Sequence, residues 1–199
     1  MKPKIKDIEI MAPVGSFESL SAAIQAGANS VYFGIEQLNM RAKSSNNFTI
    51  EDLKTIVKIC RENNLKSYLT VNTIIYDKEI SLMKKIVDAA KECDVSAIIA
   101  SDQSVIHYAF SKAVEVHIST QLNISNIETV KFYSMFADVM VLARELNLSQ
   151  VLEITEAIQN EQIKGPSGKL IEIEIFIHGA LCMAVSGKCY LSLHEQNYS

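Results

Sequence analysis

The 199-residue sequence lacks any stretch long and apolar enough to cross a membrane, because no window reaches the ~18 consecutive apolar residues that a membrane span needs. Its start, Met1-Lys-Pro-Lys-Ile-Lys-Asp, also lacks the apolar run of a secretory signal. We therefore predict a cytoplasmic protein with no membrane partner. Hydrophobic residues make up 48% of the chain and charged residues 21%, so the chain can bury a substantial core.

An excess of basic residues is also missing. The formal net charge is −4, which counts against autonomous binding of nucleic acid by the surface as a whole. A local cluster such as Arg41 with Lys43 could still contact phosphates.

Cysteines are few, and in a cytoplasmic chain they are more often free thiols, metal ligands or redox groups than disulfides. Of the four, Cys60 and Cys93 fall in helical patterns and are predicted to be small core residues. Cys182 and Cys189 differ, because both follow an apolar run in a predicted loop.

Short β-branched or apolar runs alternate with amphipathic helical patterns along the whole chain. The predicted strands are Ile8–Ala12, Ser30–Gly34, Ser67–Asn72, Ala97–Ser101, Val114–Ser119, Asp138–Leu142 and Ile171–His178. The predicted helices are Ser16–Ala26, Ile50–Asn63, Lys78–Cys93, Gln103–Lys112, Asn126–Phe136 and Ser149–Gln159. Two predicted N-caps, Thr49 and Ser125, each have an acidic residue three positions later.

Repeated βα units predict a parallel sheet, because each strand must return through a crossover helix. Seven strands in one series favour a (β/α) TIM-type barrel, and an open doubly wound sheet is the structural rival. That rival lacks support, since both G-x-G-x-x-G and the P-loop pattern G-x-x-x-x-G-K-[ST] are absent. A complete barrel usually needs ~250 residues and eight strands. We therefore expect residues 1–199 to form a single barrel domain with seven of eight strands, truncated at its C-terminal side.

The stretch Glu174-Ile-Phe-Ile-His-Gly-Ala-Leu-Cys-Met-Ala-Val-Ser-Gly-Lys-Cys-Tyr-Leu-Ser192 carries the most specific pattern in the chain. Its frame, E-x-F-x-x-G-A-L-C-x-x-x-x-G-x-C-x-L-S, resembles the signature of the U32 family, which has long been labelled as peptidases. Other segments resemble that family in its usual order. They are Ala12-Pro-Val-Gly-Ser-Phe-Glu-Ser-Leu20, Ala22–Gly34, Asn39-Met-Arg-Ala-Lys43, Val71-Asn-Thr73, His117-Ile-Ser-Thr-Gln121 and Ala143-Arg-Glu145.

Several members of this family are oxygen-independent hydroxylases, and the thiol-bearing segment is most similar to members that form 5-hydroxyuridine at the tRNA wobble position. The resemblance implies tRNA as a partner, a [4Fe–4S] cluster held by four cysteines, and prephenate as a co-substrate. By motif, Cys182 and Cys189 would be the first two cluster ligands. The family's other ligand cysteines lie downstream and are not in these 199 residues, so we expect an incomplete cluster here.

Most residues in these motifs follow a predicted strand, and in a barrel the loops after the strands converge on the active-site face. The predicted substrate-binding residues are Arg41, Asn72, Gln121, Arg144 and Glu145. A carboxylated substrate would need guanidinium forks, whereas amides orient a substrate by paired donors and acceptors. His117 and His178 could relay protons, and are the predicted catalytic residues. For Arg144 beside Glu145 a plain salt bridge is the competing interpretation, and a lone histidine in a strand is more often a hydrogen-bonded interior group than a catalytic one.

The family label also requires a peptidase to be considered. His194-Glu195 begins like H-E-x-x-H, but Tyr198 stands where the second histidine would be, and no G-x-S-x-G elbow is present. A cysteine nucleophile with His178 as its base is conceivable, although no third orienting group is identified. Hydroxylation of ribosomal RNA, hydroxylation of a quinone precursor and a non-catalytic role as a barrel fragment also stay open. A barrel lacking its last unit would have an open sheet edge, which makes self-association possible.

Overall fold

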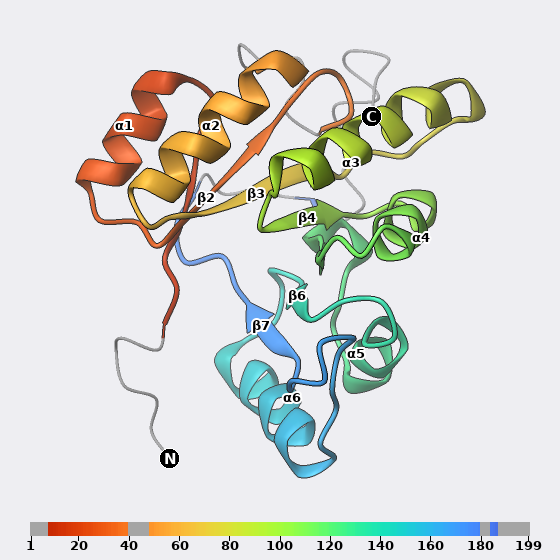
Figure 1. The fold of residues 1–199 in the computed structure, drawn as a ribbon. Coiled ribbons are helices and arrows are strands. Elements are labelled where there is room, and N and C mark those ends of the chain that lie inside the picture. Colours follow the sequence, from red (N-terminus) through yellow and green to blue (C-terminus); the bar gives the residue numbers. More distant parts are fainter. Residues whose placement is uncertain (1–7, 40–47, 180–183, 187–199) are drawn as a thin grey trace. The chain divides into compact units, whose positions relative to one another are not determined.

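The computed structural model describes residues 8–39, 48–179 and 184–186, and seven strands alternate with helices along them (Figure 1). The strand order in the sheet is β1-β2-β3-β4-β5-β6-β7, which is the chain order. Strands pair in parallel from β1 to β4 and again from β5 to β7. This is a partial TIM-type α/β barrel, as predicted, and the rival open sheet whose strand order reverses is wrong.

The strands are short, and helices separate them. The strands are β1 (Met11–Pro13), β2 (Ser30–Gly34), β3 (Lys66–Val71), β4 (Ala97–Ala100), β5 (Val116–Ile118), β6 (Val139–Val141) and β7 (Glu172–Glu174). The α-helices are α1 (Phe17–Gln25), α2 (Ile50–Glu62), α3 (Ile80–Cys93), α4 (Gln103–Ser111), α5 (Ile127–Tyr133) and α6 (Leu148–Asn160). Two 3₁₀ turns, η2 (Asp77–Glu79) and η3 (Thr120–Leu122), were not predicted. No helix in the described part is long and apolar enough to span a membrane.

The chain packs as two compact units, Met1–Glu115 and Val116–Ser199. The single barrel domain that the sequence predicts over residues 1–199 stays a prediction. In the first unit, α1, α2 and α3 lie along one side of the strands β1 to β4 (Figure 1). The inward side of α2 consists of Leu53, Ile56, Val57 and Cys60, all buried. Full burial of one large aliphatic side chain is worth about 1.5–3 kcal/mol, so this stripe anchors the helix.

Helix starts follow local capping chemistry. The Thr49 side chain accepts a hydrogen bond from the Asp52 amide at 3.3 Å, and the Asp52 carboxylate accepts one from the Thr49 amide at 2.9 Å. This capping box confirms the predicted start of α2. The predicted cap of α5 at Ser125 is wrong, because Asn126 is the N-cap and its Oδ1 accepts from the Thr129 amide at 3.0 Å. Asn and Ser are equally good caps, so composition alone could not choose between neighbours.

The loop between β2 and α2 is closed at its neck. Ile35 and Phe48 form a parallel bridge, and the Glu36 amide donates to the Phe48 carbonyl at 2.9 Å. The Glu36 carboxylate in turn accepts from the Ile50 amide at 3.1 Å, at the first residue of α2. Glu36 has a φ of 52°, a left-handed conformation that is costly for a residue with a Cβ. The two ends of this loop are therefore fixed to each other.

Gly34, the last residue of β2, lies directly against the side chain of Asn39. A Cβ on Gly34 would come within 2.3 Å of Asn39 Cγ. Asn39 is buried, and its Nδ2 donates to the carbonyls of Ile35 and Glu36, both at 3.4 Å. Glycine is needed here because of this close approach and not because of its backbone conformation.

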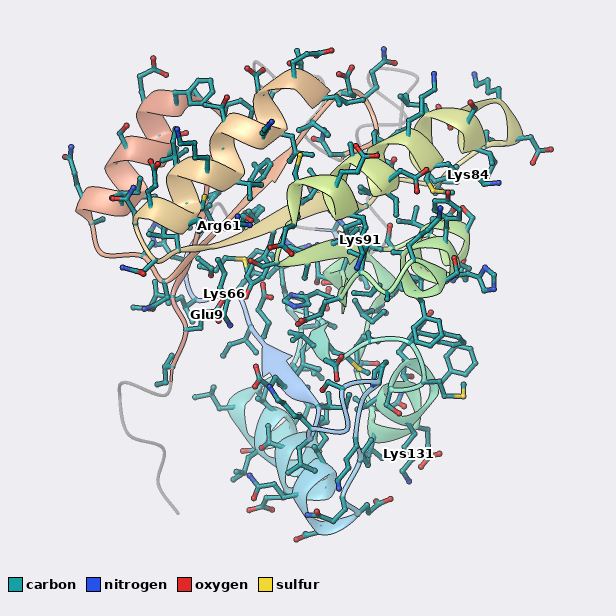
Figure 2. The ribbon with its side chains drawn as sticks, in the orientation of Figure 1. Glu9, Arg61, Lys66, Lys84, Lys91 and Lys131 are labelled. Carbon is teal, nitrogen blue, oxygen red and sulfur yellow. The ribbon has the colours of Figure 1, made fainter. Side chains whose placement is uncertain are left out.

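At the other end of the first-unit strands, a small polar cluster surrounds Glu9 (Figure 2). Lys66 Nζ lies 2.6 Å from Glu9 Oε2, and the Tyr68 hydroxyl donates to Glu9 Oε1 at 2.6 Å. Partial burial raises the pKa of Glu9, but the hydrogen bonds from Lys66 and Tyr68 help to outweigh it and hold the net pKa below its ordinary value. Glu9 thus links the segment before β1 to β3 at the N-terminal face of the strands. This is the face opposite the one where a barrel places its reactive loops, so the expected role of the pair is structural.

In the second unit, β5, β6 and β7 lie side by side, with α5 and α6 packed together. Residues Gly165–Gly168 form a turn, in which the Gly168 amide donates to the Gly165 carbonyl at 3.0 Å. An isolated antiparallel bridge between Lys164 and Leu170 closes this turn just before β7. The predicted self-association through an open edge stays a prediction.

Two predicted strands differ most from the structure. Strand one begins at Met11 and not at Ile8, because the Ile10 amide bonds to the Asn29 side chain at 2.8 Å instead of to a strand. Strand seven ends at Glu174 and not at His178. The apolar run Ile175-Phe-Ile177 that suggested a longer buried strand is exposed, with Ile177 82% accessible. An apolar run forms a strand only where a neighbour pairs with it.

Candidate functional site

The C-terminal ends of β5, β6 and β7 meet at one edge of the second unit. Ile118 of β5 is in register with Met140 of β6, which pairs in turn with Ile173 of β7. The segment after β5 contacts the end of β6, since Thr120 Oγ1 donates to the Leu142 carbonyl at 3.3 Å and Ile124 forms a bridge with Leu142. Residues that follow these strands are therefore held at a common edge, as a barrel requires.

Arg144 and Glu145, which follow β6, contact a segment about forty residues away in the sequence. The Arg144 amide and Nε donate to the Ser186 hydroxyl at 3.2 and 3.3 Å. Arg144 Nη2 donates to the Ala184 carbonyl at 3.3 Å, and the Glu145 carboxylate accepts from the Ser186 amide. Arg144 and Glu145 are exposed, whereas Ser186 is completely buried. These two residues thus dock Ala184–Ser186 against the end of β6.

The electrostatics of this contact favour an ionised Glu145. Desolvation raises the pKa of the Glu145 carboxyl, but the backbone hydrogen bond from Ser186, with further contributions from the Ser186 hydroxyl and the Arg144 charge, brings the net pKa below its ordinary value. Glu145 is therefore a carboxylate at neutral pH, and it accepts a charge-assisted hydrogen bond.

Gln121 lies in η3, directly after β5, and is half-buried. The Ser119 hydroxyl donates to Gln121 Oε1, which fixes the amide at this end of the strand. His117 lies within β5 and is 2% exposed, so it is an interior residue. His178 follows β7 and is exposed to solvent.

The remaining predicted residues lie elsewhere. Asn72 directly follows β3 in the first unit and is half-buried. Arg41, Cys182 and Cys189 fall outside the described residues. The structure thus gathers Gln121, Arg144 and Glu145 at one edge of the second unit. Convergence of Arg41, Asn72 and His178 with them in one pocket stays a prediction.

Cys60 and Cys93 are not ready metal ligands. Cys60 is 1% exposed in α2, which confirms it as a core residue, and burial raises the pKa of its thiol to about 11. Cys93, at the end of α3, is only half-buried, and desolvation together with the charge of Glu92 raises its pKa as well. Metal binding needs thiolates, which such environments disfavour at neutral pH. Among residues 8–39, 48–179 and 184–186, no group of three or more His, Cys, Asp or Glu side chains could hold a metal ion.

A cavity of about 460 Å³ lies between α6 and the segment leading into β7. Its lining includes Ile158, Ile171 and Ile173 but none of the predicted site residues. Its other lining residues are Thr155, Gln159, Lys169, Leu170 and Glu172, so the cavity lies beside α6 and the start of β7, away from the strand ends where a barrel places its active site. The candidate site is therefore the edge that carries Gln121, Arg144 and Glu145.

Comparison with known proteins identifies the family behind this arrangement. The family model for peptidase family U32 matches residues 15–199. This chain belongs to peptidase family U32. The U32 chain is also similar in fold to a solved structure described as the U32 peptidase Mk0906, with a TM-score of 0.64, 12% identity, and coverage of 86% of this chain and 93% of that one.

Curated relatives of the U32 chain have two kinds of name. A "Collagenase" of Porphyromonas gingivalis is 65% identical over 98% of this chain and 47% of the relative. The "tRNA hydroxylation protein P1" of Bacillus subtilis is 34% identical over 95% of this chain and 43% of the relative. The "23S rRNA 5-hydroxycytidine C2501 synthase" of Escherichia coli is 33% identical over 95% of this chain and 27% of the relative. The U32 chain thus spans about half the length, or less, of these relatives.

Sequence reasoning missed two serines at this edge. Ser186 stands between Cys182 and Cys189 in the thiol-bearing motif, and Ser119 stands between His117 and Gln121 in another family motif. The signal for both was available, because each is a small polar residue inside a motif that carries the resemblance. Their partners were not predictable, since Ser186 bonds to residues more than forty positions away.

Proposed function

We propose that this chain is the barrel portion of an oxygen-independent RNA hydroxylase that modifies the wobble uridine of tRNA in the cytoplasm. The observation that carries the proposal is the match of nearly the whole chain to relatives named for tRNA hydroxylation and for forming 5-hydroxycytidine in ribosomal RNA. Some of these names refer to tRNA and one to ribosomal RNA, so hydroxylation of an RNA base is what they share.

The site chemistry supports this function in outline. Amides such as Gln121 and Asn72 can orient a base or a small carboxylated substrate. We propose prephenate as that small substrate, and Arg41 can pair with the prephenate carboxylate. His178 is exposed to solvent, and its proposed role is to transfer a proton during the reaction. His117 is enclosed in β5, so its proposed role is to support the strand end from within.

The proposed cofactor is a [4Fe–4S] cluster with Cys182 and Cys189 as two of its ligands. When bound, such a cluster supplies electron transfer and a Lewis-acidic iron. Four cysteine ligands are needed, and this chain does not provide a fitting set, because Cys60 is buried with a raised pKa and Cys93 lies at the end of α3. A complete cluster would therefore require cysteines from outside these 199 residues.

The proposal is tested by mass spectrometry of nucleosides from total tRNA. We expect 5-hydroxyuridine and its derivatives to disappear in a strain without the gene, and also in strains carrying Cys182→Ala or Cys189→Ala. Cys93→Ser, a thiol change at the half-buried end of α3, serves as the matched control and should leave the nucleoside at its normal level. Unchanged 5-hydroxyuridine in the deletion strain would refute the tRNA assignment, and loss of 5-hydroxycytidine from ribosomal RNA instead would assign the enzyme to that substrate.

Peptide hydrolysis is the second candidate, because the relative that is 65% identical is named a collagenase. The purified protein incubated with gelatin distinguishes the two. Cleavage that Cys182→Ala or His178→Ala abolishes would support a thiol peptidase, in which the thiolate attacks the peptide carbonyl and the histidine protonates the leaving amine. Intact gelatin together with loss of hydroxylated tRNA in the deletion strain would support the RNA hydroxylase.

A further inference from the structure

Arg144 and Glu145 make four hydrogen bonds to the short segment Ala184–Ser186. All four lie at the end of β6, and they link positions 40 to 42 residues apart. Ser186 is fully buried although it belongs to a loop, so its amide and hydroxyl need partners within the protein. Glu145 and Arg144 supply them.

The Arg144 side chain is committed to this contact by its geometry. Its Nε and Nη2 donate to Ser186 Oγ and the Ala184 carbonyl. These nitrogens form one side of the planar guanidinium, the same side that a carboxylate would use for side-on bidentate binding. Arg144 therefore cannot hold Ala184–Ser186 and offer that side to a substrate carboxylate at once.

The docked segment Ala184–Ser186 lies between the two predicted ligand cysteines in the sequence. Ala184 is two positions after Cys182, and Ser186 is three positions before Cys189. Arg144 and Glu145 thus bind two residues that lie between the two thiols in the sequence. Fixing the middle of a short segment restricts both of its ends, because few freely rotating residues remain on either side.

We propose that Arg144, Glu145 and Ser186 act as one positioning unit, which holds the segment between Cys182 and Cys189 at the end of β6. In this role Arg144 and Glu145 act through the thiols and do not bind substrate themselves. The inference rests on the proposed function for the purpose of the thiols, but the contact itself can be tested without any reaction.

The first measurement is the alkylation rate of each cysteine in the metal-free, reduced 199-residue protein, followed by mass spectrometry. The variants are Glu145→Gln, Ser186→Ala, Arg144→Lys and the double variant Arg144→Lys/Ser186→Ala. Losing about 1 kcal/mol of hydrogen bonding raises the open population about fivefold, so we expect Cys182 and Cys189 to react about five times faster in each single variant. Cys60 and Cys93 provide internal references and should keep their rates.

Two features of the result decide between the outcomes. The double variant should react faster than either single variant but by less than the product of the two increases, because the bond from Arg144 Nε to Ser186 Oγ is lost in both. The control Glu153→Gln, on the exposed face of α6, should match the unmodified protein. Unchanged alkylation of both thiols in Glu145→Gln and Ser186→Ala, or rates in the double variant that multiply, would overturn the proposal.

The second measurement separates this inference from the proposed function. In cells, Ser186→Ala should lower hydroxylated tRNA as much as Arg144→Lys does, although serine carries no charge for a carboxylate. Normal hydroxylation in Ser186→Ala with loss in Arg144→Lys would return Arg144 to substrate binding and overturn the positioning role. If the unmodified protein hydroxylates no RNA, the proposed function fails, and the alkylation result still decides whether the positioning unit exists.

Discussion

Gly34→Ala offers the sharpest test of the packing at the end of β2. The new Cβ would lie 2.3 Å from Asn39 Cγ, 2.4 Å from Nδ2 and 2.7 Å from Oδ1. Asn39 is 4% exposed and cannot swing into solvent without breaking its hydrogen bonds to Ile35 and Glu36. Overpacking of this kind costs about 1–3 kcal/mol. Losing the Asn39 hydrogen bonds adds about 1 kcal/mol.

We therefore expect Gly34→Ala to lower the free energy of unfolding by about 2–4 kcal/mol, as the sum of the overpacking and the lost hydrogen bonds. Urea denaturation followed by circular dichroism measures this loss. The matched control repeats the substitution in an Asn39→Ala background, where the obstacle is gone and the added cost should fall below about 1 kcal/mol. A loss of less than about 0.5 kcal/mol in the original background, or an equal loss in both, would show that Asn39 is not the cause.

Two further predictions concern ionisation. The folded pKa of Glu9 lies below its ordinary value, so its ion pair with Lys66 stabilises the protein above the unfolded pKa and is lost as the pH falls through the folded pKa. Thermal midpoints of Glu9→Gln should therefore decline less steeply than those of the unmodified protein below about pH 5, and parallel curves would contradict this. Cys60, with a pKa of about 11, should resist iodoacetamide at about pH 8 until the protein is unfolded in urea, and rapid modification of the native protein would contradict its burial.

The central strands could be predicted from sequence with little error. Strand β2 matches its predicted range of Ser30–Gly34. Strand β3 is shifted by one residue at both ends, and β4 is one residue shorter than predicted. These runs are buried almost throughout, so the apolar pattern directly reflects the environment. The run Ile175-Phe-Ile177 has a similar composition but is exposed, because hydrophobicity does not reveal whether a neighbouring strand is present.

The candidate site was predictable in position but not in its contacts. Arg144 and Gln121 follow predicted strands, and that rule alone placed them at the correct edge. The partners of Arg144 were not predictable, because no local periodicity connects it with a serine 42 positions later. An arginine that follows a strand occupies the same place in the sequence whether its guanidinium binds a substrate or another part of its own chain.

The closed neck at Glu36 and Phe48 has a consequence for how this protein can change. Because Ile35 pairs with Phe48 and Glu36 accepts from the Ile50 amide, the end of β2 and the start of α2 are joined by bonds of their own. Doubling the length of such a loop costs only about 0.6 kcal/mol in closure entropy. Added length between the two neck residues should therefore cost little stability, provided that buried Leu38 and the contact of Asn39 with Gly34 are kept.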